Sequence, residues 1–370
     1  CASFDIMVNI LKYIFLSFLF ISCSSKEDPT DIPPINNIFP SNLTLSITIV
    51  GNDSENPNGD GSGMIQCMAS ADEAISYGFR FGTGVELESI SGNYDYTFTN
   101  PGVNSYTISV YAYSSTGDSV NISETITVYV EEPDPVATWS EEFNIDGSPS
   151  SDTWVFEIGT GCPDLCGWGN GESQYYTDRM ENVKVEDGVL KITAKTESYN
   201  GSNYTSARII SRDKYEFQYG RVDIRAKLPT GSGTWPALWM LGANQQSVGW
   251  PACGEIDIME HWGHNPTIIS AAIHTSESFG DTQNHGQTTV TDYSTQFHIY
   301  SINWTAEKIE FLVDDNIYYT YNPSPKTDAN WPFDAPAFFI LNIAMGGHWF
   351  DIDPNFEQST MEVDYIRVYQ

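Results

Sequence analysis

Three carboxylates lie within six residues of the segment GEIDIMEHW, residues 254–262. Glu255 and Asp257 alternate with isoleucines, which is the two-residue period of a strand with one acidic and one apolar face. Glu260 comes one residue too late for the acidic face, and we expect a β-bulge to return it there. Buried charges are costly unless they are paired or used, so this placement calls for a function.

Two neighbouring carboxylates suit the hydrolysis of a glycosidic bond. One acts as nucleophile and the other as general acid; a separation of about 5 to 5.5 Å gives retention at the anomeric carbon, and a larger gap gives inversion. Asp257, between the two glutamates, would raise the cost of a second negative charge and help keep one carboxylic acid protonated near neutral pH. Two other interpretations stay open: three solvated acids on an edge strand, or a Ca²⁺ site.

The composition limits the binding partners. The 370 residues include 16 Lys and Arg against 49 Asp and Glu, which gives a formal net charge of −33. Such a surface repels phosphate backbones, sulfated polymers and anionic headgroups. We therefore predict no nucleic-acid binding, and a neutral polymer or small molecule as the substrate.

The first residues are typical of a targeting segment. The stretch MVNILKYIFLSFLFISC, residues 7–23, holds one Lys and an apolar run that is too short to be a good membrane span. It resembles a bacterial lipoprotein signal, which implies a start at Met7, a signal segment over residues 1–23 and lipidation of Cys23. Residues 24–36 resemble a surface-export tether. We expect an exported outer-membrane or cell-surface lipoprotein; a single membrane-anchor helix is the alternative.

The rest of the chain divides in two. Residues 37–132 alternate in strand rhythm and, through YGFRFGTG, resemble a PKD-type immunoglobulin-like sandwich, with a spacer favoured over a weak carbohydrate-binding module. Residues 133–138 are a predicted linker. Residues 139–370 hold all ten Trp and all six His, with recurring strand-like runs and turn signals. This region predicts an all-β domain, a two-sheet sandwich of the jelly-roll kind.

Four cysteines follow the signal segment, at positions 67, 162, 166 and 253. An exported protein is in a compartment that permits disulfides. Cys162 and Cys166 could pair with each other, or one of them could reach Cys253 beside the acidic cluster. A zinc site that combines these three thiols is a weaker alternative, because no second close-spaced Cys/His pair accompanies them.

The acidic segment GEIDIMEHWG resembles the signature of glycoside hydrolase family 16 in its bulged E-x-D-x-x-E form. The similarity covers most of residues 139–370, through TWSEEF, GWGNGESQYYTDRMENVKVEDGVLKITA, FFILNIAMGGHW and MEVDYIRVYQ. It implies that Glu255 is the nucleophile, Glu260 the general acid/base and Asp257 the assisting residue, and that catalysis needs no cofactor.

GWGNGESQYYT and GTWPALWMLG resemble the laminarinase branch of that family, which implies substrate-binding roles for Asn170, Arg208, Trp235, Trp239 and His274. Each tryptophan could instead pack in a core, the asparagine could serve a turn and the arginine could form a structural ion pair. Trp250 and Trp262 are further candidate aromatics. The family also implies a structural Ca²⁺ at Glu142, Gly188 and Asp364.

The predicted activity is endo-acting, retaining hydrolysis of β-1,3-glucan (laminarin) by a monomeric protein. The bulged signature disfavours the lichenase and xyloglucan branches, and the scarcity of Lys and Arg disfavours sulfated substrates. Mixed-linkage β-glucan, agar, porphyran and carrageenan are the alternative substrates. A non-catalytic surface protein that binds glycans and an adhesion protein are the alternatives from other functional classes.

Overall fold

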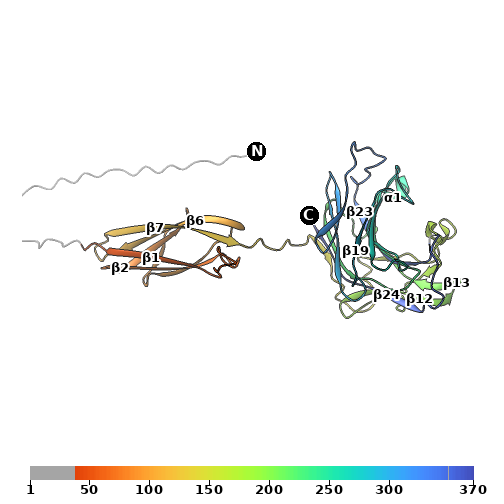
Figure 1. Ribbon diagram of the computed structural model, residues 1–370, viewed down its shortest axis with the longest axis horizontal. Helices are drawn as coiled ribbons and strands as arrows, with labels where there is room; N and C mark the ends of the chain where they lie inside the picture. Colours follow the sequence, from red (N-terminus) through yellow and green to blue (C-terminus); the bar gives the residue numbers. More distant parts are fainter. Residues whose placement is uncertain (1–37, 349) are drawn as a thin grey trace, which may run out of the picture. The chain divides into compact units, whose positions relative to one another are not determined.

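The computed structural model describes residues 38–348 and 350–370, so the predicted signal segment, Cys23 and tether lie outside the described residues. The chain forms two compact units, which divide between Pro133 and Asp134. Both are built from strands (Figure 1), so the all-β prediction is confirmed. Among the described residues, no helix has the length and apolar character needed to cross a bilayer.

The N-terminal unit is a two-sheet sandwich. Its core side chains come from both sheets and include Phe79, Ile65 and Ile108, which are fully buried. One sheet has the order β1–β2–β5, with strands Ser41–Ile49, Met64–Asp72 and Asn93–Thr97. The other has the order β4–β3–β6–β7, with strands Leu87–Ser89, Ser76–Phe81, Gly102–Tyr113 and Ser119–Val130.

The C-terminal unit has a seven-stranded and a ten-stranded sheet, the predicted two-sheet sandwich. The seven-stranded sheet runs β19–β18–β17–β16–β23–β14–β9, with strands His285–Thr289, Ile268–His274, Glu255–His261, Thr234–Gly242, Ala337–Met345, Arg208–Ile210 and Val155–Phe156. The short helix α1, Gln245–Val248, follows β16.

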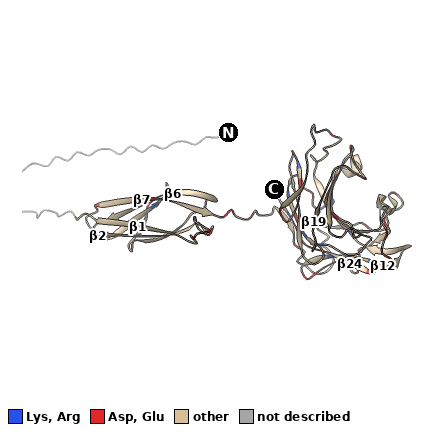
Figure 2. Cartoon of the chain, in the orientation of Figure 1, with Lys and Arg blue, Asp and Glu red and all other residues tan. Residues whose placement is uncertain are grey.

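The ten-stranded sheet has its main path in the order β10–β13–β12–β24–β15–β20–β21–β22. These strands are Gln174–Tyr176, Ser202–Ser206, Val189–Tyr199, Gln358–Tyr369, Gly220–Lys227, His298–Trp304, Ile309–Val313 and Asn316–Tyr321. Two further strands join it: β11, Val183–Glu186, pairs with β12, and β8, Trp139–Glu141, pairs with β24. Figure 2 colours the charged residues along both units.

One face of the seven-stranded sheet packs on the core and the other faces away from it. Along β16, Leu238 and Met240 belong to the main core, whereas Trp235 and Trp239 lie at alternating positions on the opposite face. The two-residue period of the strand produces this separation. We call this outer face of the sheet the site face.

The predicted β-bulge in β17 is confirmed by the strand registers. Asp257 pairs with Trp239 on β16 and with Ala272 on β18, but three residues later Glu260 pairs with Ala237 and Ser270, two residues further along each neighbour. The extra residue leaves Ile258 and Met259 both buried in the core. The bulge thereby returns Glu260 to the site face, with Glu255 and Asp257.

Candidate active site

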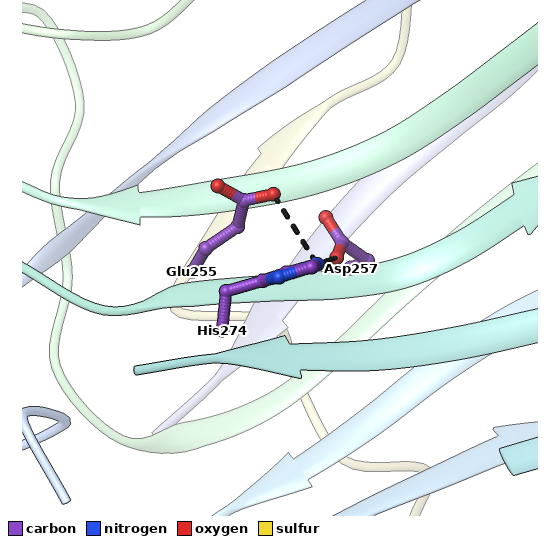
Figure 3. A group of neighbouring side chains, drawn as sticks. All are labelled: Glu255, Asp257 and His274. Carbon is purple, nitrogen blue, oxygen red and sulfur yellow. Dashed lines mark ion pairs between the residues drawn. The ribbon is translucent and has the colours of Figure 1, made fainter. Parts of the chain in front are cut away.

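The three acids of β17 differ in their surroundings. Asp257 is only 3% exposed, whereas Glu255 and Glu260 are partly exposed. His274, at the end of the neighbouring strand β18, lies opposite Glu255 in the register. Its Nε2 lies 3.1 Å from Asp257 Oδ2 and 3.8 Å from Glu255 Oε1, so one imidazole bridges two carboxylates (Figure 3).

The protonation of His274 is set by opposing effects. Burial disfavours its charged form, but the contact with Asp257 and the charges of the three acids outweigh this and raise its pKa to about 9. On the other side of the ring, the backbone N–H of Gly280 approaches Nδ1 at 3.2 Å, which favours the neutral ring with its proton on Nε2. Either form presents an N–H to Asp257.

Each outer glutamate accepts a hydrogen bond from an indole. Trp250 Nε1 donates to Glu255 Oε2 at 2.6 Å, and Trp235 Nε1 donates to Glu260 Oε1 at 2.9 Å. These donors come from different places, Trp250 from the segment before β17 and Trp235 from β16. A fixed donor on each carboxylate holds the free oxygen of that group in a defined direction.

The pKa values of two of the acids lie above their usual range. Burial, followed by the charges of Glu255 and Glu260, raises the pKa of Asp257 well above its ordinary value. Burial also raises the pKa of Glu260, although the nearby His274 and the indole of Trp235 oppose this rise. The cluster therefore retains protons that isolated carboxylates would lose, as a general acid on this strand requires.

The same cluster also brings together side chains that could hold a metal ion. Glu255, Asp257 and His274 offer ligand atoms that all lie within 4.8 Å of one another. Such a donor set could hold a divalent cation, which was one of the interpretations left open by the sequence. The indole hydrogen bonds to both glutamates fit proton chemistry better, because they already occupy one oxygen of each.

Arg208 lies farther across the site face, on β14. Its Nε forms an ion pair with Glu157 Oε2 at 2.6 Å, and its guanidinium lies over the rings of Trp168 and Trp239, 4.6 and 4.8 Å from their centroids. Arg208 therefore forms the structural ion pair that the sequence left open as an alternative. It also contacts Trp239, a predicted substrate-binding residue.

A chain of hydrogen bonds, which was not predicted from the sequence, connects Trp239 on β16 with Asn170 in the segment before β10. Trp239 Nε1 donates to Asn342 Oδ1 at 2.7 Å, Asn342 Nδ2 donates to Tyr176 Oη at 3.0 Å, and Tyr176 Oη donates to Glu172 Oε2 at 3.1 Å. Glu172 Oε1 then accepts a hydrogen bond from Asn170 Nδ2 at 3.2 Å. The lone asparagine of the apolar run FFILNIAM was a usable signal for this chain, because a buried polar side chain needs partners.

Comparison with known proteins identifies the family to which this chain belongs. Residues 170–367 match the model of the glycosyl hydrolases family 16. The chain belongs to this family. A β-glucanase from Rhodothermus marinus is 45% identical over 245 residues, which cover 63% of this chain and 84% of the relative.

Solved structures of the family agree with this assignment. A laminarinase from Flavobacterium sp. UMI-01 is 46% identical, with a TM-score of 0.60, and the match covers 64% of this chain and all of that one. The catalytic domain of an endo-1,3-β-glucanase (laminarinase) from Thermotoga petrophila RKU-1 is 42% identical, with a TM-score of 0.60 and coverage of 64% and 98%. The matched share corresponds in size to the C-terminal unit.

The cysteine pairing in this family 16 chain is local. Cys162 and Cys166 form a disulfide in the loop before β10, and Cys67 and Cys253 are buried free thiols. Burial, followed by the charge of Glu255, raises the pKa of Cys253 to about 11, so its thiol stays protonated and unreactive at neutral pH. Of the alternatives in the sequence analysis, the pairing of Cys162 with Cys166 is the one present.

The three residues named for calcium lie on or directly beside three adjacent strands of the ten-stranded sheet, β8, β24 and β12. β24 pairs with β12 up to Val363 and with β8 from Ile366, so Asp364 lies in the gap between these two neighbours. Glu142 directly follows β8, and Gly188 directly precedes β12. Both carboxylates already have arginine partners: Arg367 with Glu142, through two hydrogen bonds of 2.9 Å, and Arg225 with Asp364. A cation here would therefore depend on backbone oxygens or displace the arginines.

Replacing Trp235 with phenylalanine tests its hydrogen bond to Glu260. The indole N–H favours the ionised carboxylate, so its loss should raise the pKa of Glu260 and move the alkaline limb of the kcat/KM profile to higher pH. A hydrogen bond to a charged group also positions it, so we expect kcat/KM at the optimum to fall by about tenfold. A profile shifted to lower pH would contradict this reading of the site.

Proposed function

We propose that this protein is an endo-acting, retaining β-1,3-glucanase that hydrolyses laminarin. The observation that carries the proposal is the bulged strand β17, which places Glu255, Asp257 and Glu260 on one face with a separate hydrogen-bond donor for each glutamate. The laminarinases among the structural relatives support the choice of substrate. So does the net charge of −33, which favours a neutral polymer.

The proposed reaction is a double displacement. Glu260, protonated because burial raises its pKa, gives its proton to the glycosidic oxygen as that bond breaks. Glu255, oriented by Trp250, attacks the anomeric carbon and forms a glycosyl ester. Glu260 then removes a proton from water as the water oxygen attacks the anomeric carbon. The ester bond to Glu255 breaks, Glu255 leaves as a carboxylate, and the sugar is released with the β configuration retained. Hydrolysis by family 16 enzymes needs no cofactor.

In this proposal Asp257 and His274 are positioning residues. Asp257 lies between the two glutamates and makes simultaneous ionisation of the whole cluster unfavourable. His274 contacts both Asp257 and Glu255, so it stabilises the negative charge that returns to Glu255 when the ester is cleaved. Asn170, Arg208, Trp235 and Trp239 are proposed to contact the sugar rings. His274, which the family resemblance placed in the same group, is also proposed to lie beside the substrate while its imidazole contacts two of the acids.

Incubation of the purified protein with laminarin tests the activity. An endo-acting enzyme should release a ladder of oligosaccharides early in the reaction, with a rapid fall in mean chain length. Release of glucose alone would contradict the endo assignment. If no new reducing ends appear with laminarin, mixed-linkage glucan, agar or carrageenan, a glycan-binding role replaces the enzymatic one.

We also propose that the protein is a monomeric, exported lipoprotein, anchored through Cys23 in the outer membrane with the N-terminal sandwich as a PKD-type spacer. The support is the apolar run that ends at this cysteine and the strand pattern of residues 37–132. Replacing Cys23 with serine should move the protein from the detergent-extracted membrane fraction to the soluble fraction. An unchanged membrane fraction would contradict lipid anchoring.

A structural Ca²⁺ at Glu142, Gly188 and Asp364 is proposed on the register gap in β24. Because a cation that binds only the folded state stabilises it, millimolar CaCl₂ should raise Tm above the value in EDTA by a few degrees. Mg²⁺ at the same concentration is the control, since its stricter octahedral geometry suits such a site poorly. Equal Tm values in all three solutions would overturn the calcium proposal.

A further inference from the structure

The loop of residues 275–284, which follows β18, holds an exposed aromatic side chain next to the candidate active site. Phe279 is 50% exposed and packs edge-on against Trp250, which is itself 45% exposed. A single exposed apolar residue is ordinary on a protein surface. Here, however, the exposed ring contacts the tryptophan that donates its N–H to Glu255.

This loop is preorganised by its own hydrogen bonds. Ser278 and Thr282 share a hydrogen bond of 2.9 Å between their hydroxyls, and the Thr282 hydroxyl also donates to the carbonyl of Ile273 at 2.9 Å. The backbone N–H of Glu277 donates to the carbonyl of Ala329 at 2.9 Å. Phe279 is thus presented on a fixed loop, so little conformational entropy is lost when a ligand packs on it.

A second contact ties this loop to the acids. The N–H of Gly280, the residue after Phe279, approaches Nδ1 of His274, whose other nitrogen contacts Asp257 and Glu255. Phe279 is therefore linked to Glu255 by two routes, one through Trp250 and one through His274. Both routes place it at the Glu255 end of the acidic strand, away from Trp235 at the Glu260 end.

The relative orientation of the two exposed rings carries the inference. The planes of Phe279 and Trp250 are inclined by 80°, with centroids 5.4 Å apart. Successive rings of a β-1,4-linked glucan keep nearly one plane and form a flat ribbon, whereas a β-1,3-linked chain turns at each linkage. Two nearly perpendicular aromatic surfaces match neighbouring sugar rings of a turning chain better than those of a ribbon.

We propose that Trp250 and Phe279 pack on two neighbouring glucose rings, and that Phe279 thereby favours β-1,3-linked over β-1,4-linked segments at this end of the site. This inference rests on the proposed glucanase function and adds a residue and a linkage preference to it. The proposed discrimination comes from the shape of the two aromatic surfaces. The catalytic step itself is unchanged by it.

The test compares Phe279→Ala and Phe279→Tyr with the unmodified protein on laminarin oligosaccharides and on mixed-linkage β-glucan. We expect Phe279→Ala to lower kcat/KM on the β-1,3 substrate by about five- to tenfold, mainly through KM, and on mixed-linkage glucan by less than about twofold. Phe279→Tyr, which keeps the ring, should retain the preference. Ile145→Ala, which removes another exposed apolar side chain in the segment that pairs with β11, should change neither substrate.

The outcomes separate this inference from the proposed function. If the unmodified protein cleaves laminarin but Phe279→Ala keeps its ratio of activities, the inference is overturned and the glucanase function stands. An equal loss on both substrates, with a lower Tm, would show a structural role and would also overturn it. If the unmodified protein has no activity on laminarin, the proposed function itself fails.

Discussion

Replacing Glu255 with serine should remove hydrolysis of laminarin while binding of the glucan persists. Serine lacks the carboxylate that attacks the anomeric carbon, and loss of a nucleophile typically lowers kcat by about 10⁴-fold or more. Binding should survive, because Trp235, Trp239 and Arg208 do not depend on Glu255 for their positions. The measurements are kcat on laminarin and the Kd of a laminarin oligosaccharide by calorimetry.

The matched control is Glu307→Gln, which removes an exposed acid from a turn of the ten-stranded sheet. Its kcat should equal that of the unmodified protein, which shows that removing a negative charge alone has no effect. A non-catalytic glycan-binding protein would behave differently, because neither substitution would change its function. Hydrolysis at a normal rate by Glu255→Ser would remove the nucleophile from this account.

Replacing Glu260 with glutamine should lower the hydrolysis of laminarin by about 10² to 10⁴-fold, the usual contribution of general acid catalysis. The loss should depend on the leaving group. An aryl β-glucan oligosaccharide with an acidic phenol needs little protonation to depart, so its glycosylation step should be largely preserved. Added azide, which attacks without a general base, should then restore turnover and give a β-glycosyl azide.

The pH profile supplies a second readout for Glu260. Burial raises the pKa of Glu260, so its protonated form persists to higher pH. On the alkaline side, activity should therefore fall as the pH rises through that pKa. Glu260→Gln cannot ionise, so the alkaline limb should disappear from kcat/KM for the aryl substrate. An alkaline limb that persists unchanged would assign the general acid to another residue.

The acidic strand could be predicted closely from local sequence. The spacing of Glu255, Asp257 and Glu260 among apolar residues was sufficient for both the strand and the bulge, because side-chain alternation is a property of the strand itself. The two-sheet sandwich followed from recurring strand patterns and turns. The strand, the bulge and the turns could be predicted because each depends mainly on residues that are close together in the chain.

Contacts between segments far apart in the chain could not be predicted in this way. The link from Trp239 through Asn342 and Tyr176 to Glu172 joins three strands, and nothing in their spacing along the chain indicates that they meet. Trp250 was named only as a candidate aromatic, and its hydrogen bond to Glu255 depends on the conformation of the segment between α1 and β17. Cysteine spacing likewise left several pairings open, and the structure shows the local one.

The calcium residues illustrate a limit of residue types as a guide. Glu142 and Asp364 are suitable oxygen ligands, and the strand registers do bring them near Gly188. Their carboxylates nevertheless pair with arginines from β24 and β15, which no pattern around the acids foretells. Whether an acid faces a cation or an arginine depends on cross-strand neighbours, which are set by the register of the whole sheet.

Time-resolved proton NMR of laminarin cleavage tests the central claim most directly. The anomeric signals of newly formed reducing ends are followed before mutarotation mixes them. A retaining mechanism with Glu255 as nucleophile and Glu260 as acid/base predicts that the β-anomer appears first and that the α-anomer grows only later. Immediate formation of the α-anomer would mean single-step inversion and would contradict the covalent role of Glu255.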